Sequence, residues 1–138
     1  MATIRFDGLN KYLAQLEQLG QRSRGICKMA VYDGAAIVAD QVRENLHRVL
    51  SPDATGQLEE SMGISKMRDD NGYINVVIGF DGYDRKGVAN QLKANVLESG
   101  SSKQQKRPFM RPAVNTSRKQ AEAKMAETLD REIEKLMK

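Results

Sequence analysis

Residues 23–49 read SRGICKMAVYDGAAIVADQVRENLHRV, and this stretch decides the fold. Small and apolar side chains recur in it every three or four residues, which places them along one side of a helix. The stripe consists of Cys27, Ala30, Val31, Gly34, Val38, Val42, Leu46 and Val49. Pro52 follows soon after and cannot continue a helix, because it has no N–H to donate. We therefore predict a long helix over 23–49, in which Gly34 lets another backbone approach closely.

The hydrophobic period changes further along the chain. Residues 73–80 read YINVVIGF and alternate, which is typical of a β-strand. The alternation places Ile74, Val76, Ile78 and Phe80 on one face. Asn71 and Gly72 precede the strand, and this dipeptide favours the two-residue turn of a hairpin. We therefore predict residues 63–68 as the antiparallel partner.

Shorter elements flank this helix and hairpin. Residues 3–6 read as an edge strand or an ordered tail, and residues 7–20 as an amphipathic helix capped by Asp7. A helical turn is predicted over 56–62 and an exposed, mobile loop over 81–87, while 88–99 is either helical or partly extended. A final helix is predicted beyond Pro112, with Val114, Ala121, Met125, Leu129, Ile133 and Leu136 inward. The predicted fold class is α+β: a small antiparallel sheet packed by a long helix, with an N-terminal helix and a long C-terminal helix.

Length and composition limit the classes of protein. The chain has 138 residues, of which 40% are hydrophobic and 29% charged, as expected for one folded domain over 1–138. Its longest apolar run, residues 35–39, is far shorter than the roughly 20 residues that cross a bilayer. The first twenty residues have no apolar stretch suited to a signal peptide. We therefore expect that the chain does not associate with a membrane and that it is synthesised in a cytoplasm.

The sequence lacks the usual patterns of catalysis. The single cysteine, Cys27, cannot form an internal disulfide, and the single histidine, His47, has no partner at metal-ligand spacing. Neither a phosphate-binding G-x-x-x-x-G-K-[ST] nor a G-x-S-x-G is present. Asp69 and Asp70 fit a hairpin turn better than a calcium loop. We therefore expect that the chain is not an enzyme and that it binds neither a cofactor nor a metal ion.

Positive charge is concentrated in one segment. The net charge is +4, but residues 101–119 hold six basic residues and no acid, which leaves the rest of the chain at −2. The six are Lys103, Lys106, Arg107, Arg111, Arg118 and Lys119. Such a segment is either a surface for a negatively charged partner, whether phosphate or an acidic protein face, or a solvated loop. With phosphate as the partner, the chain is a sequence-independent DNA-binding module.

Three stretches, in order, carry a resemblance to a known family. Residues 52–61 read PDATGQLEES, residues 96–102 read VLESGSS, and residues 107–113 read RPFMRPA. They resemble the neck or tail-completion (head-tail joining) proteins of long-tailed bacteriophages and prophages, which read roughly P-x-x-T-G-x-L-x-x-S, then E-x-G-[TS], then P-F-[ML]-R-P-A. The matching residues are Thr55, Gly56, Leu58, Ser61, Glu98, Gly100, Pro108, Phe109, Met110, Arg111 and Pro112.

This resemblance implies a non-enzymatic virion part. It implies a ring at the neck, between the head connector and the tail tube, through which the genome passes. The expected partners are further copies of the chain and the connector and tail-tube proteins, and passing genomic DNA is a further candidate. The expected location is the virion, after synthesis in the cytoplasm of the bacterial host.

Two groups of motif residues have alternative roles. Phe109 and Met110, held between Pro108 and Pro112, either anchor an interface or fasten the last helix to the core of the same chain. Thr55 and Gly56 either make contacts or act locally, Thr55 as a helix cap and Gly56 as a residue that permits a tight entry. The sequence favours the local role for Thr55 and Gly56 and leaves Phe109 open.

Overall fold

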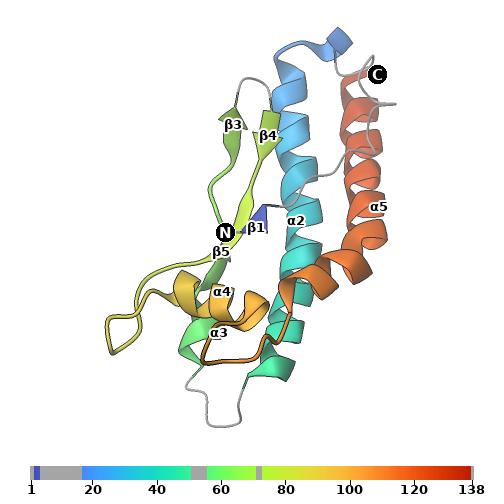
Figure 1. The fold of residues 1–138 in the computed structure, drawn as a ribbon. Coiled ribbons are helices and arrows are strands. Elements are labelled where there is room, and N and C mark those ends of the chain that lie inside the picture. Colours follow the sequence, from blue (N-terminus) through green and yellow to red (C-terminus); the bar gives the residue numbers. More distant parts are fainter. Residues whose placement is uncertain (1, 4–16, 51–55, 71–72, 138) are drawn as a thin grey trace.

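The computed structural model describes residues 2–3, 17–50, 56–70 and 73–137 (Figure 1). Its elements follow the order β1 (Ala2–Thr3), α2 (Arg22–Val49), α3 (Gln57–Ser61), β2 (Met62–Ile64), β3 (Arg68–Asp70), β4 (Tyr73–Asn75), β5 (Val77–Phe80), α4 (Asn90–Ser99) and α5 (Met110–Met137). The α+β class predicted from the sequence is confirmed, with two long helices beside small antiparallel sheets.

Helices α2 and α5 lie side by side along most of their length (Figure 1). Ile26 and Ala30 of α2 form a buried cluster with Met125, Leu129 and Ile133 of α5. The last helix therefore docks on its own chain. The predicted inward stripe of α5 is correct except at its end, where Leu136 is exposed because the packed interface does not extend that far.

Helix α5 begins earlier than predicted. Its first residue is Met110, so Pro112 lies inside the first turn and does not precede the helix. The N–H groups of a first turn have no partner within the helix, so a proline there sacrifices no hydrogen bond. The helix was predicted beyond Pro112, but a proline in the first turn is compatible with a helix, so the start at Met110 is too.

The predicted strand over 73–80 is two strands in two sheets. β5 lies between β1 and β2, whereas β4 pairs with β3. Ile64 pairs with Ile78, and Arg68 pairs with Asn75. Three residues, 65–67, lie between these pairs on one side of the ladder, but only two, 76 and 77, lie between them on the other. This extra residue is a β-bulge, which interrupts the ladder and resets the alternation of side chains. The predicted partner over 63–68 is therefore also divided, into β2 and β3.

The bulge explains a second departure from the predicted alternation. Val76, Val77 and Ile78 are consecutive and all buried, which a regular half-exposed strand does not allow. Ser65 bridges the irregular site, because its N–H donates to Val77 O at 2.8 Å and its Oγ accepts from Val77 N–H at 2.9 Å. Asn71 and Gly72 lie outside the described residues, but the pairing of Asp70 with Tyr73 is the one that a hairpin requires.

The main core lies between the three-stranded sheet and the second half of α2. Val38, Val42 and Leu46 of α2 face Ile78 and Phe80 of β5 in one buried cluster.

The helical turn predicted over 56–62 is confirmed as α3, and the helical alternative for 88–99 is confirmed as α4. At the N-terminus, β1 pairs with β5. Of the helix predicted over 7–20, residues 17–19 are helical, while residues 4–16 lie outside the described residues. None of the helices that the structure describes is long and apolar enough to span a membrane.

Gly34 leaves room for the side chain of Met125 between the two long helices. A Cβ built on it would lie 2.6 Å from both Cγ and Sδ of Met125. Overpacking of this kind costs about 1–3 kcal/mol, more than the roughly 1 kcal/mol that alanine gains over glycine in a helix. We therefore expect Gly34→Ala to lower the free energy of unfolding in urea.

Gly25 provides the matched control on the same helix. A Cβ there would meet no atom within 4 Å, and the residue is exposed. Gly25→Ala should therefore raise the free energy of unfolding by up to about 1 kcal/mol. Equal effects of the two substitutions would show that the approach at Gly34 is not tight.

Candidate functional site

The second and third sequence motifs come together at the junction between α4 and α5, residues 98–111. Helix α4 ends at Ser99, and Gly100 has a φ of +80°, a conformation that favours glycine. The polar loop that follows folds back, and Arg107 N–H donates to Leu97 O at 2.6 Å. A Cβ on Gly100 would lie 3.0 Å from the Lys106 nitrogen. Glycine at this position therefore brings the start of α5 against the end of α4.

Glu98 caps the N-terminus of α5. Its Oε2 accepts from the N–H groups of Phe109 at 2.7 Å and Met110 at 2.9 Å, and its Oε1 accepts from Arg111 N–H at 2.9 Å. These are N–H groups that a helix cannot satisfy internally, and the negative charge is favourable at the positive end of the helix dipole. The glutamate of the second motif and the helix start of the third thus form one structural unit.

Phe109 occupies the core and not the surface. Its side chain is fully buried, and its ring meets the ring of Phe80 in an edge-to-face contact with centroids 6.0 Å apart. Asn45 Nδ2 donates to Phe109 O at 3.2 Å, and Met110 is also buried. Of the two alternatives for Phe109 and Met110, the structure places both side chains in the core of their own chain.

The first motif is also built into the fold. Gly56 is the N-cap of α3 with a φ of +83°, which agrees with the local role expected for it, while Thr55 lies outside the described residues. Leu58 is buried in the main core. Ser61 Oγ donates to Leu58 O at 2.7 Å. The described residues of this motif therefore act within the chain.

Of the matching motif residues that the structure describes, Pro108, Arg111 and Pro112 are exposed. The basic residues Lys103, Lys106, Arg107, Arg118 and Lys119 are also exposed. Two of these cations are engaged, since Arg107 Nη1 donates to Val49 O at 3.0 Å at the end of α2 and Arg118 lies 4.0 Å from Glu122. Phosphate contacts would have to come chiefly from Lys103, Lys106, Arg111 and Lys119.

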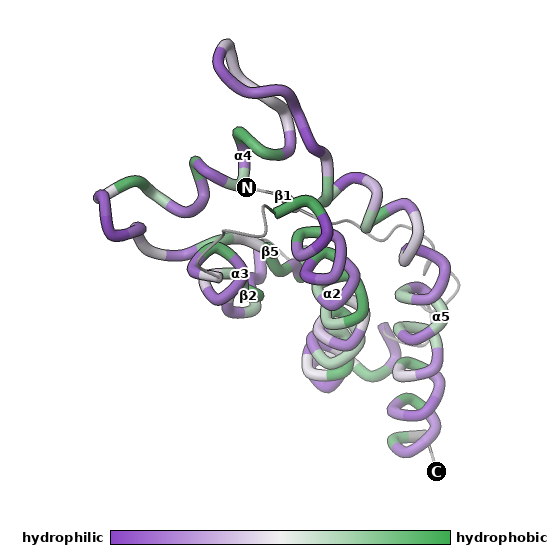
Figure 2. The backbone as a smooth tube through the Cα atoms, turned by 90° about the horizontal axis from the view of Figure 1, so that it is seen from below, coloured by the Kyte–Doolittle hydropathy of each residue, from purple (hydrophilic) through white to green (hydrophobic). Residues whose placement is uncertain are grey.

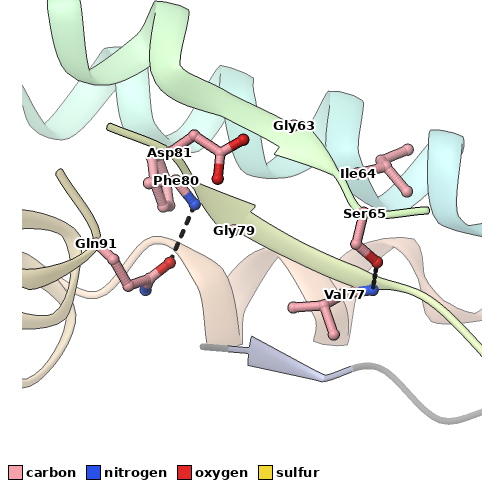
Figure 3. Close-up of a pocket in the computed structure, with 8 residues that line it drawn as sticks. All are labelled: Gly63, Ile64, Ser65, Val77, Gly79, Phe80, Asp81 and Gln91. Carbon is pink, nitrogen blue, oxygen red and sulfur yellow. Dashed lines mark hydrogen bonds between the residues drawn. The ribbon is translucent and has the colours of Figure 1, made fainter. Parts of the chain in front are cut away.

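A shallow groove of about 150 Å³ crosses the outer face of strands β2 and β5 (Figure 3). Gly63 and Gly79, which are paired across the strands, leave its floor without side chains. Its polar side chains are used by the fold: Gln91 Oε1 accepts from Phe80 N–H at 3.0 Å, and Ser65 Oγ accepts from Val77 N–H. The groove therefore presents little chemistry beyond the Asp81 carboxylate.

The two candidate reactive side chains lie apart from the groove. His47 is exposed on α2, with Nδ1 3.0 Å from Glu59 Oε1. Cys27 is half-buried, and this burial raises the pKa of its thiol, which makes it less reactive. No group of three or more potential metal ligands occurs within the described parts of the chain.

The loop over 81–87, predicted as exposed, is exposed but has a defined turn. Asp84 organises it by accepting from Lys86 N–H at 2.8 Å, Val88 N–H at 2.9 Å and Lys93 Nζ at 3.2 Å. Tyr83 and Ala89 form an isolated β-bridge across its base. The sequence prediction missed this turn, since its key contacts join Asp84 to residues up to nine positions away.

Acidification is expected to loosen this turn. The hydrogen bond from Val88 N–H, with help from Lys93 and Lys86, holds the pKa of Asp84 below its ordinary value of 3.8. Because the folded pKa lies below the unfolded one, the stabilisation is complete above the ordinary pKa and is lost as the pH falls through the folded value. An NMR titration should place the Asp84 midpoint below 3.8. A midpoint at or above that value would show that these hydrogen bonds do not form.

Comparison with known families supports the resemblance seen in the motifs. Residues 10–100 match the HK97-gp10-like family, described as "Bacteriophage HK97-gp10, putative tail-component". Comparisons with curated proteins and with solved structures gave no match. The matched segment contains the first motif and ends at Gly100 of the second, and Glu98 within it caps the helix that the third motif opens. Since the match covers more than half of the chain, this protein belongs to the HK97-gp10-like family of phage tail components.

Proposed function

We propose that the chain is a structural virion protein of a tailed phage or prophage, which forms a ring at the neck, completes the tail and joins it to the head connector. The observation that supports this most is the family match over residues 10–100. The three motifs, which resemble neck and tail-completion proteins, support the finer assignment. The role is one of assembly, with no bond made or broken.

Deletion of the gene in its phage or prophage tests this proposal. We expect electron microscopy to show DNA-filled heads and separate tails, because the part that joins them would be missing. A plasmid copy of the gene should restore complete particles. Normal joined virions after deletion would refute the neck assignment, whereas loss of tails alone would indicate an earlier role in the tail.

The proposed partners are further copies of the chain, the connector and the tail-tube protein. A ring subunit offers different patches to its two neighbours, and Pro108, Arg111 and Pro112 are the exposed motif residues available for such contacts. A pull-down with the tail-tube protein should retain the full-length chain. Absence of any association, with itself or with these partners, would count against the ring.

A second candidate function is sequence-independent DNA binding. It is favoured by the exposed cations Lys103, Lys106, Arg111 and Lys119, for which no ion pair occurs among the described residues. Four phosphate contacts predict that log K falls against log salt with a slope of about −3.6 on duplex DNA. Gel retardation across a salt series measures this slope, and no retardation at low salt would exclude the candidate.

A further inference from the structure

Among the described residues, the buried apolar side chains of α2 and α5 fall into two clusters that share no member. The main cluster joins the second half of α2, from Val38 to Leu46, to the three-stranded sheet and the start of α5. The second cluster consists of Ile26 and Ala30 of α2 and Met125, Leu129 and Ile133 of α5. The long helices are thus held together by two groups of contacts, one at each end.

The second cluster lies away from most of the fold. In Figure 1 the three-stranded sheet, α3 and α4 lie beside the second half of α2, whereas the first half is flanked by α5 and the β3–β4 hairpin. The hairpin is joined to α2 by an ion pair, Arg24 Nε to Asp69 Oδ2 at 2.9 Å. The Arg24 side chain is 63% exposed, so this ion pair contributes little stability. We name residues 22–33 of α2 and 122–137 of α5 the distal pair.

Gly34 marks the boundary of the distal pair on α2. It lies between Ala30 of the second cluster and Val38 of the main cluster. Apart from proline, glycine is the least favourable residue in a helix interior. It also offers no side chain that could connect the two clusters, and the side chain of Met125 fills the space beside it. Helix α2 is therefore weakest where the clusters meet.

Helix α5 has its own weak point between the clusters. Thr116 Oγ1 donates to Pro112 O at 3.0 Å, and Ser117 Oγ donates to Ala113 O at 2.6 Å. Hydroxyl groups that bond to a carbonyl four residues earlier slightly destabilise a helix and often bend it. In both views α5 changes direction after its first turns (Figure 1, Figure 2). Ala121 still belongs to the main cluster, so the distal part of α5 starts after it.

A buried polar contact fixes the closed arrangement of the distal pair. Thr128 is fully buried and donates through Oγ1 to Asp33 Oδ2 at 2.6 Å. A hydrogen bond is directional, so this one defines how α5 is seated along α2. On opening, water replaces both partners, so the bond adds much less to the cost of opening than its strength inside the protein.

We propose that the distal pair opens as a unit, in which residues 122–137 leave residues 22–33 while the main core stays folded. Clusters that share no member and are joined through weak points are suited to such partial opening. The open form exposes an apolar stripe, Met125, Leu129 and Ile133, that the closed chain hides. The fold thus contains a conformational device that presents this surface only in the open form. This inference goes beyond the proposed ring and does not depend on it.

Native-state hydrogen exchange of the full chain tests the opening, under conditions in which the rate reports the population of the open form. Amides at 27–31 of α2 and 126–131 of α5 should exchange at least about tenfold faster than those at 40–46 of α2, with one common free energy of opening. Equal exchange in all three sets would overturn the proposal. A graded increase toward the end of α5, without the amides of α2, would mean that the helix only frays, and would also overturn it.

Two matched substitutions give a sharper test. Ile78 in the main cluster and Ile133 in the second are both buried, and Ile→Val is a mild change at either. Ile78→Val should speed exchange at 40–46 by about 2- to 13-fold and leave the distal amides unchanged, because Ile78 stays buried when the distal pair opens. Ile133→Val should speed exchange in all three sets, because its contacts are lost in partial and in global unfolding alike.

The two variants therefore have different expected patterns. If Ile78→Val speeds exchange equally in all three sets, the chain opens only as a whole and the distal pair is not a unit. If Ile133→Val leaves the distal amides unchanged, its contacts do not hold the pair closed, and the proposal falls as well. The proposed function is tested separately, by deletion of the gene.

Discussion

Replacing Phe109 with alanine is expected to lower the free energy of unfolding by about 3–5 kcal/mol, the usual range for a buried phenylalanine. The side chain is fully buried, packs edge-to-face on Phe80 and lies in the main core with Leu46 and Ala113. Its removal leaves a cavity where α5 joins α2 and the sheet. Urea unfolding followed by circular dichroism measures the change.

The exposed aromatic Tyr83 is the matched control. With 75% of its surface in solvent, Tyr83→Ala should change the free energy of unfolding by less than about 0.5 kcal/mol. This comparison distinguishes the two alternatives for Phe109, an interface anchor or a residue that fastens the last helix to the core of its own chain. If Phe109→Ala unfolds like the parent chain but loses association, the residue is an interface anchor and its buried position is wrong.

This position changes the meaning of the motifs. The sequence RPFMRPA, which resembles a family signature, holds Phe109, Met110 and Ala113 inside the chain. It leaves its two arginines and two prolines, residues 107, 108, 111 and 112, outside. The motif therefore serves first to start α5 and fix it on the core. Its exposed residues are the part of the motif that other virion proteins could reach.

Helix α2 could be predicted from the sequence because its signals are local. The apolar stripe from Cys27 to Val49 and the proline after it predicted a helix over 23–49. The observed helix is Arg22–Val49, so the predicted start is one residue late and the predicted end is correct. Gly34 was predicted to let another backbone approach closely, whereas the structure places the side chain of Met125 against it, with the backbone atom Ala121 O 3.5 Å from the position of a Cβ. Periodicity of this kind needs no knowledge of the rest of the chain.

The sheet could be predicted only in part. The register shift between β2 and β3 depends on one extra residue near Ser65, and nothing local to YINVVIGF marks it. A run of alternating residues therefore suggested one strand, although the chain forms β4 and β5. The spacing over 88–99 left a helical and a partly extended form open, and the structure makes residues 90–99 helical while Ala89 before them is extended.

The candidate site depends on contacts between distant residues. Glu98 accepts hydrogen bonds from the N–H groups of residues 109–111 and so joins the second motif to the third. The sequence alone shows only that these two motifs follow one another. A glutamate twelve residues before a helix start is not a capping pattern that local rules describe. One indirect signal was available, since the two motifs recur together in the family that the chain resembles.

Replacing Glu98 with glutamine is expected to lower the free energy of unfolding by about 2–4 kcal/mol, almost as much as replacing it with alanine. Both carboxylate oxygens accept hydrogen bonds from the start of α5, two on Oε2 and one on Oε1. Glutamine has one acceptor oxygen, and its NH₂ group would face an N–H donor, so the amide satisfies only part of the cap and loses the charge. Amide hydrogen exchange should become faster at Phe109, Met110 and Arg111 before it does in the middle of α5. The exposed Glu60 is the matched control, and Glu60→Gln should leave both measurements unchanged. If Glu98→Gln retained the stability of the parent chain, a neutral acceptor would suffice, and the charge of Glu98 would have no part in holding the two motifs together.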